Sequence, residues 1–349
     1  MERDSSAIIN NNSLKFSQLY FLLSLLVVFI HSYTFYENVE NVHWILQKTI
    51  SDNISRIAVP LFFTISGFFL FLKYENSWDN YITLVRKKIR TLVVPYFLWS
   101  VTTFILMFLI QSVYPHVNQE LIIDKTVREN ILSILLGENT VLWFIRILFI
   151  MTMLAPLIKI VISHKYLYIP VLFILFALDF SDIGFNFWFL KLDSLLFFII
   201  GGVISQNSYL LDKRINIYLL LALSVFFAAA NIYMDWGTNS NVNDVNLFER
   251  LFILSFSLFV WNCNHIYILM DKVPHKYYHY SFTIYMFHAQ VIVMIFKESL
   301  TFMLSNSTII YILTGIITFS FCLALSIFLE KYTPGLYRAY SGGRNIRSN

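Results

Sequence analysis

Cysteine and charge are both scarce in this chain, and each shortage excludes a class of protein. Only two of the 349 residues are cysteine, Cys263 and Cys322, and both fall in apolar runs. A disulfide framework is therefore excluded, and we expect no metal site because no cysteine and histidine cluster has metal-ligand spacing. Charged residues make up 13% of the chain, whereas soluble domains have about 25%. A soluble globular protein is excluded, and we expect no nucleic-acid partner.

Apolar residues are correspondingly abundant. They make up 58% of the chain, with 35 phenylalanines and a mean hydropathy of +0.65. A window of about 19 residues predicts ten membrane-spanning segments, near residues 16–35, 56–73, 92–113, 142–162, 166–180, 194–208, 215–234, 249–270, 278–296 and 308–329. The sequence therefore predicts an all-α integral membrane protein.

The organisation predicted is one transmembrane domain over residues 1–349. It has a polar head at 1–14 and a basic tail at 338–349, with no cleavable signal peptide and no internal repeat. The longest stretch between apolar segments, roughly 114–141, is too short for a soluble domain.

The charges suggest an orientation. If the N-terminus is cytoplasmic, most of the 25 lysines and arginines fall in inner segments, as the positive-inside rule requires. We therefore predict that both termini are cytoplasmic. The pattern favours the cytoplasmic membrane of a bacterium, with membrane lipid as a partner.

Residues 57–70 read IAVPLFFTISGFFL, which is apolar enough for lipid but contains a proline and a Ser66-Gly67 pair. Arg56, Pro60, Thr64 and Gly67 share one face of a helix, by their spacing. Such residues are not expected on a helix face that contacts lipid. We therefore expect this face to border an internal site, with Arg56 and Ser66 lining the cavity.

His31 lies toward the end of the first apolar segment. Ser17, Tyr20, Ser24 and His31 form a polar stripe on one side of this helix. A histidine is the usual general base near neutral pH. The alternative is a histidine that only hydrogen-bonds a neighbouring helix or sits at the membrane interface.

Arg146 lies inside the fourth apolar segment and follows the turn TVLWF. A guanidinium in the membrane is costly and normally faces a partner, a cavity or a substrate anion. It could hold a carboxylate or phosphate or stabilise an oxyanion, and we expect Trp143 to line the same cavity. The alternative is a structural ion pair with Glu138 or Asp193.

Arg86, Lys87, Lys88 and Arg90 are four cations within five residues, in the inner loop before the third segment. They could bind the phosphates of a nucleotide at the cytoplasmic face. A positive-inside anchor has the same composition and can bind anionic lipid, so basicity alone does not decide between them.

Ser281, Tyr285 and His288 form a second polar stripe, on the ninth segment. We expect all three to line the cavity. The alternative for His288 is a buried histidine that bridges helices. The chain has no GxSxG, Walker or HExxH motif.

Together these segments resemble the acyltransferase 3 family of integral membrane O-acyltransferases, in the form without a soluble extracytoplasmic domain. The matching stretches, in order along nearly the whole chain, are VVFIHSYTF at 27–35, RIAVPLFFTISGFFLF at 56–71, KKIRTLVVPYFLW at 87–99, LWFIRILFIMTMLAPLI at 142–158 and SFTIYMFHAQ at 281–290.

The resemblance implies transfer of an acyl group, commonly acetyl from acetyl-CoA, to a hydroxyl of a glycan, lipid or secreted small molecule. It implies that His31 is the essential first-helix histidine and that residues 86–90 meet the CoA. One position departs from the family, which usually has Arg or Lys eleven residues before the histidine. Here that residue is Tyr20, so Lys15, Arg56 or Arg146 supplies the charge, or the site is altered.

The expected mechanism follows from these roles. Acetyl-CoA binds from the cytoplasm, and His31 either deprotonates the acceptor hydroxyl or carries the acetyl group itself. Arg146 or Arg56, with tyrosine hydroxyls such as that of Tyr20, stabilises the oxyanion. The donor could also carry a longer or charged acyl group such as succinyl.

Two other classes remain open at this point. A transporter or flippase for a glycan or lipid-linked substrate has the same buried charges and broken helices. Many transporters contain an internal repeat, however, and none is evident in this sequence. A non-catalytic sensor or scaffold is favoured only if Tyr20 indicates that the catalytic site has been lost.

Overall fold

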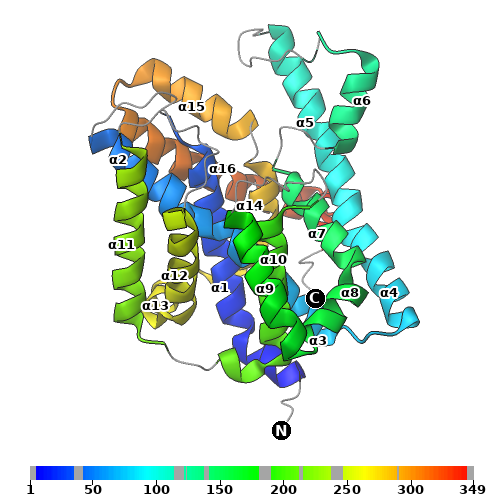
Figure 1. Cartoon of the computed structure of the whole chain (residues 1–349). Coiled ribbons are helices and arrows are strands. Elements are labelled where there is room, and N and C mark those ends of the chain that lie inside the picture. The colour runs from blue at the N-terminus through cyan, green and yellow to red at the C-terminus, as the bar shows by residue number, and fades with distance from the viewer. Residues whose placement is uncertain are drawn as a thin grey trace.

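A computed structural model of the chain describes residues 5–34, 42–113, 122, 124–136, 141–180, 190–211, 215–236, 247–288 and 291–343. These residues form a bundle of helices and contain no strand (Figure 1). The α-helices are α1 (Ser5–His31), α2 (Val42–Lys48), α3 (Ala58–Lys73), α4 (Trp78–Lys88), α5 (Val94–Val113), α6 (Val127–Leu136), α7 (Trp143–Met153), α8 (Ala155–Ile162), α9 (Lys165–Phe180), α10 (Leu192–Gln206), α11 (Ile217–Asp235), α12 (Leu247–Asn262), α13 (Asn264–Met270), α14 (Ser281–Phe287), α15 (Val291–Met303), α16 (Ser307–Tyr332) and α17 (Pro334–Ser341).

Shorter helical turns join some of these helices. Two are π-helical, η1 (Thr49–Asn53) and η3 (Ile89–Val93), and three are 3₁₀-helical, η2 (Ile54–Ile57), η5 (Ser208–Leu211) and η6 (His275–Tyr280). The N-terminus lies at the lower end of the bundle in Figure 1, while α2 and α15 lie at the upper end.

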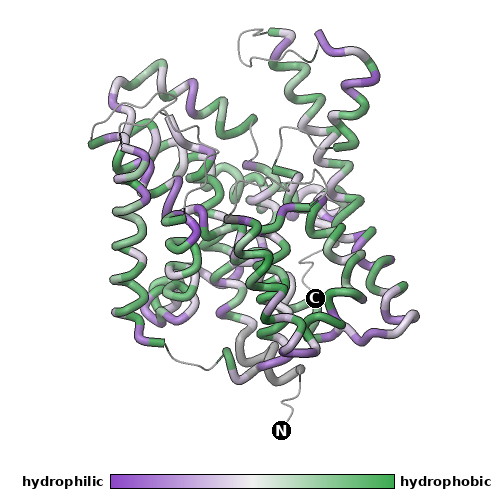
Figure 2. The backbone as a smooth tube through the Cα atoms, in the orientation of Figure 1, coloured by the Kyte–Doolittle hydropathy of each residue, from purple (hydrophilic) through white to green (hydrophobic). Residues whose placement is uncertain are grey.

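Several of these helices are long and apolar enough to cross a membrane. Within the described residues there are five, or up to eight if each of three bent helix pairs counts as one span. The long helices α5 and α11 are largely hydrophobic along their length (Figure 2). Each of the ten predicted segments coincides with a helix or a bent pair, but α9 and α10 have only 16 and 15 residues. The protein is thus an all-α membrane protein, and ten spans with cytoplasmic termini stay a prediction.

The segment predicted at 142–162 is bent rather than straight. Helices α7 and α8 meet at an angle of 69°. Pro156 lies in the first turn of α8, where its missing N–H is tolerated but its ring prevents α7 from continuing.

The stretch around Arg86 is a helix and not a loop. Helix α4 begins after Ser77, whose hydroxyl accepts a hydrogen bond from the Asn80 N–H at 3.3 Å. It continues through the π-turn η3 into α5. Pro95 has no N–H to donate to the carbonyl of Thr91, so the chain widens to π geometry at this point. The prediction of a loop here is wrong, because the proline is accommodated within a continuous helical path.

Helices α3 and α10 form the most extensive contact between described elements. A Cβ atom added at Gly67 would lie 2.1 Å from the Phe198 carbonyl oxygen, and one added at Gly201 would lie 1.9 Å from that of Thr64. Small residues thus let the two backbones meet, as is common between membrane helices. The prediction that Thr64 and Gly67 border a site is therefore wrong, because that face of α3 packs against α10.

Candidate functional site

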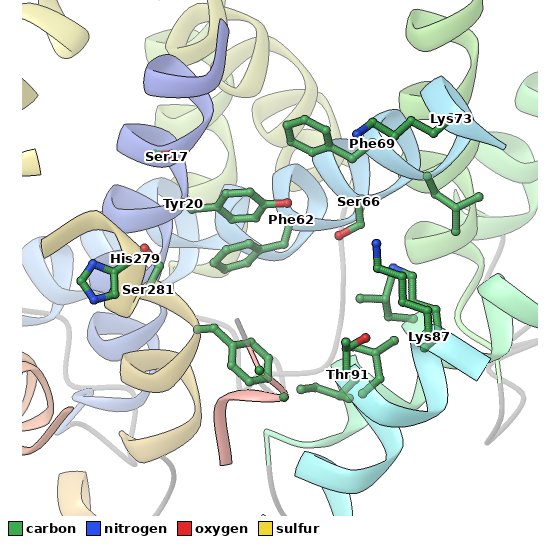
Figure 3. A pocket seen from close by; sticks show the side chains of 18 of the residues that line it. Ser17, Tyr20, Phe62, Ser66, Phe69, Lys73, Lys87, Thr91, His279 and Ser281 are labelled. Carbon is green, nitrogen blue, oxygen red and sulfur yellow. The ribbon is translucent and has the colours of Figure 1, made fainter. Parts of the chain in front are cut away.

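The opposite face of α3 borders a cavity of about 1020 Å³ near the N-terminal end of α1. Parts of α1, α3, α4, η3, α7, η6 and α14 surround it, together with Gly342 and Gly343 after α17. In Figure 3, Tyr20 and Phe62 project into this space from α1 and α3, and Lys87 projects from the α4 side. Its volume lies at the upper end of the range of about 300–1,000 Å³ that is usual for small-molecule sites.

One part of the cavity is polar. Its cationic and polar side chains come from α3, α4 and η3 and include Lys73, Lys87, Lys88, Asn80, Thr83 and Thr91. Two histidines of η6 line the cavity beside Ser281 and already face carboxylates, since His279 lies 3.3 Å from Glu330 and His275 lies 3.9 Å from Asp271. Among the described residues, no carboxylate forms an ion pair with Lys73 or Lys87. This part of the cavity therefore suits an anion.

The other part is closed by four aromatic rings, which we call the aromatic end: Tyr20, Phe62, Phe144 and Tyr285. The rings of Tyr20 and Phe62 are stacked, with centroids 5.7 Å apart. The Tyr285 ring lies 6.0 Å from that of Phe62 and 5.5 Å from that of Phe144. The Tyr285 hydroxyl donates to the carbonyl of Val141, which fixes the ring at this end.

Two histidines, the histidine pair, lie beyond the aromatic end. The His288 ring is 5.7 Å from the Tyr285 ring and 5.3 Å from the His31 ring. His288 is fully buried, whereas His31 keeps accessible surface although protein atoms surround it densely. His31 is also the last residue of α1. These groups therefore follow one another in space as Tyr285, His288 and His31.

Two cations act on His31. Arg56 and Lys297 are near enough for their charges to influence its ring. Arg56 is held by Asp52 at 3.3 Å and by Glu249 at 4.0 Å. Its charge is therefore shared with two carboxylates that fix its position near the histidine.

No neighbour on α1 supplies the positive charge that the family usually has at the position of Tyr20. The Lys15 ammonium lies over the rings of Trp261 and Tyr267, at 5.6 and 4.8 Å from their centroids. Arg146 donates a hydrogen bond to the carbonyl of Leu136. Of the three cations considered from the sequence, Arg56 is the one whose charge acts on His31.

Arg56 belongs to a group of charged side chains at the upper end of the bundle, the ion-pair layer. Lys48 lies 2.6 Å from Asp235 and 3.8 Å from Asp52. Arg250 lies 2.9 Å from Asp179 and 3.8 Å from Asp193. The layer consists of Lys48, Asp52, Arg56, Asp179, Asp193, Asp235, Glu249 and Arg250. It joins α2, η1 and η2 to α9–α12, and each of its three cations lies next to a carboxylate, although its five carboxylates outnumber them.

The structure thus divides the predicted site residues into three groups. Those that line the cavity are Tyr20, Ser66, Lys87, Lys88, Ser281 and Tyr285. His31 and His288 lie beyond the aromatic end. The remaining ones, Arg56, Arg86, Arg90, Trp143 and Arg146, are not among its lining residues. Trp143 instead has the Lys191 ammonium over its ring, 3.8 Å from the centroid.

Some residues at the site had no clear sequence signal. Lys73 ends α3, and His275 and His279 are in η6. Gly342 adopts φ = 68°, and a Cβ atom there would lie 2.6 Å from the Thr91 carbonyl oxygen. The Gly342-Gly343 pair is the one signal that could have been found, because adjacent glycines after a helix predict a left-handed turn.

The comparison with known families is consistent with this arrangement. The acyltransferase 3 family model, described as an acyltransferase domain, matches residues 19–327. The chain belongs to this family. Membership indicates a multi-pass membrane O-acyltransferase. No curated protein and no solved structure shows significant similarity to the chain.

Proposed function

We propose that the protein transfers an acetyl group from cytoplasmic acetyl-CoA to a hydroxyl group of a cell-surface or exported glycan, in a bacterial cytoplasmic membrane. One observation carries the proposal: a cavity with a cationic part leads to an aromatic end, and a histidine pair lies directly beyond that end. A charged nucleotide with a long flexible arm and a terminal thioester fits this sequence of environments.

Each part of the donor has a counterpart in the cavity. Phosphates are attracted by Lys73, Lys87 and Lys88, which supply ammonium donors. The pantetheine arm lies against the rings of the aromatic end, where apolar contact favours it. Its thioester then approaches the histidine pair from one side, while the acceptor hydroxyl approaches the accessible His31 from the other.

His31 is the general base of this proposal. It removes the proton of the acceptor hydroxyl as the oxygen attacks the thioester carbonyl. Arg56, held by Asp52 and Glu249, is the cation that this proposal assigns to the negative charge that develops beside His31. Arg56 acts on His31, whereas Arg146 does not, which makes Arg56 the better candidate for that role.

The test is release of CoA from acetyl-CoA by purified wild-type and His31→Ala proteins, with a crude surface-glycan extract as acceptor. We expect release by wild type and a loss of at least about 100-fold in the variant. Size-exclusion profiles and thermal unfolding show whether both proteins are folded. Succinyl-CoA, used in parallel, identifies a charged donor.

The same assay distinguishes an enzyme from a transporter. Bent helix pairs such as α7–α8 are also typical of transporters. A folded wild-type protein that consumes neither donor, with or without the extract, would contradict the proposal. Equal release by wild type and His31→Ala would keep the enzyme but exclude His31 as its base.

A further inference from the structure

His288 is an unusual residue for the centre of a membrane bundle. It has 0% relative exposure, and neither ring nitrogen has a partner of hydrogen-bond geometry among the described residues. The backbone of Ile284 and Tyr285, one turn back, supplies acceptors near its ring. A buried polar group without a partner costs about 1–3 kcal/mol. A histidine that only filled space would be replaced at lower cost by an apolar ring.

Two rings lie next to the ring of His288. The Tyr285 ring, which lines the cavity, is 5.7 Å away. The His31 ring is 5.3 Å away. At that ring separation, facing nitrogens come within hydrogen-bond reach after a small rotation or through one water molecule. His288 is thus the polar group between the donor cavity and the proposed base.

A neutral imidazole carries one N–H donor and one acceptor nitrogen. It can therefore accept a proton on one nitrogen while it releases a proton from the other, and it carries no net charge afterwards. This property suits a fully buried ring, because a charged imidazolium in a dry interior is costly.

We infer that His288 relays the proton of the acceptor hydroxyl from His31 to the sulfur of the departing CoA. The inference rests on the proposed function and adds a second catalytic residue to it. The relay uses both nitrogens of the ring, and neither has a partner of hydrogen-bond geometry among the described residues.

The reaction balances as follows. The acceptor O–H bond breaks as its proton moves to His31, and the oxygen forms a bond to the thioester carbonyl carbon. The tetrahedral intermediate then expels the sulfur with the electrons of the C–S bond. His31 returns its proton to one nitrogen of His288, and the other nitrogen of His288 protonates the sulfur. The products are an ester and CoA thiol, and the ring regains its first tautomer by exchange with water in the emptied cavity.

Donors with different leaving groups test this role. Alkyl thiols are weak acids, with a pKa of about 8.5 in cysteine, so a thiolate benefits from protonation as it leaves. The acetyl selenoester of selenocoenzyme A provides a selenolate, which leaves without a proton because selenols are much stronger acids. We expect His288→Gln to lower transfer from acetyl-CoA about 100-fold and transfer from the selenoester less than about 10-fold.

Three variants serve as controls. His288→Phe keeps the ring and removes both polar atoms from a buried position, so it folds even if His288→Gln does not, and the same donor dependence is expected. His31→Gln removes the base and should lower transfer from both donors alike. Tyr285→Phe disturbs the neighbouring ring without removing a proton relay, so any loss should also be equal for the two donors.

The outcomes are distinct. An equal loss with both donors in His288→Gln and His288→Phe would overturn the relay and leave the proposed function standing. Wild-type protein that transfers from neither donor would overturn the proposed function and this inference with it. Selective recovery of the two His288 variants with the selenoester would establish the relay.

Discussion

The two ends of the bundle differ in whether their cationic side chains form ion pairs. At the upper end, Lys48, Arg56 and Arg250 each lie within 2.6–3.3 Å of a carboxylate. Around the cavity near the N-terminus, Lys73 and Lys87 form no ion pair with a described carboxylate. Paired charges stabilise the positions of the helices that carry them. Lysines without such pairs beside a cavity remain available to an anion that enters it.

The largest effect should come from breaking the ion-pair layer. Arg250 contacts Asp179 and Asp193, and its side chain is only 16% exposed. Arg250→Leu leaves two carboxylates without their cation, which costs about 3–5 kcal/mol when a buried pair loses one partner. We expect a clearly lower unfolding temperature in detergent.

The double variant Arg250→Leu with Asp179→Leu is the matched control. It removes both members of the closer pair, so it should unfold at a higher temperature than Arg250→Leu alone. If the single variant unfolds like wild type, the layer does not stabilise the bundle and the proposed difference between the two ends is lost.

A smaller effect is expected at the contact that links the two ends. Helix α3 borders the cavity with one face and packs on α10 with the other. A Cβ atom at Gly201 would lie 1.9 Å from the Thr64 carbonyl oxygen, so Gly201→Ala forces the helices apart at a cost of about 1–3 kcal/mol. Because α3 also borders the cavity, CoA binding should weaken as well.

Gly335→Ala is the control for this change. Nothing lies within 4 Å of a Cβ atom at Gly335, so neither thermal unfolding nor CoA binding should change. A Gly201→Ala protein with wild-type stability would show that the backbones of α3 and α10 can separate without cost.

Helix positions were the part of the structure most accessible from sequence. Each predicted apolar segment coincides with a helix or bent pair, since long apolar runs have few alternatives to a helix in a membrane. The bend before Pro156 and the π-turn before Pro95 were not predicted. A proline signals a local disturbance, but whether the helix ends, bends or widens depends on what packs around it.

The site was harder to predict because its residues come from distant segments. Periodicity placed Ser281, Tyr285 and His288 on one face of a helix, but it did not show that Tyr285 lines a cavity while His288 lies behind it. Gly67 was assigned to a cavity because it shares a helix face with Arg56, but a small residue permits close approach to another helix as well as to a substrate. Only the packed structure distinguishes these two uses.

The smallest expected effect concerns two adjacent cations, Arg86 and Lys87. It tests the comparison between the two ends of the bundle most directly, because only one of the two side chains lines the cavity. Both side chains are exposed, but Lys87 lines the cavity and Arg86 is not among the lining residues. Lys87→Ala should weaken CoA binding about 5-fold, or about 1 kcal/mol, through loss of one ammonium near a phosphate. Arg86→Ala should change it little, since an exposed charge beyond the cavity is screened by salt.

Equilibrium titration of CoA at low and at physiological ionic strength measures both variants. The difference between them should shrink as salt is added but should not vanish, because a contact inside a cavity is screened less than one at the surface. If Arg86→Ala and Lys87→Ala weaken binding equally, the basic stretch acts as a general electrostatic attractor, and the cavity lysine has no distinct role. The contrast between the two ends of the bundle would then rest on the ion-pair layer alone.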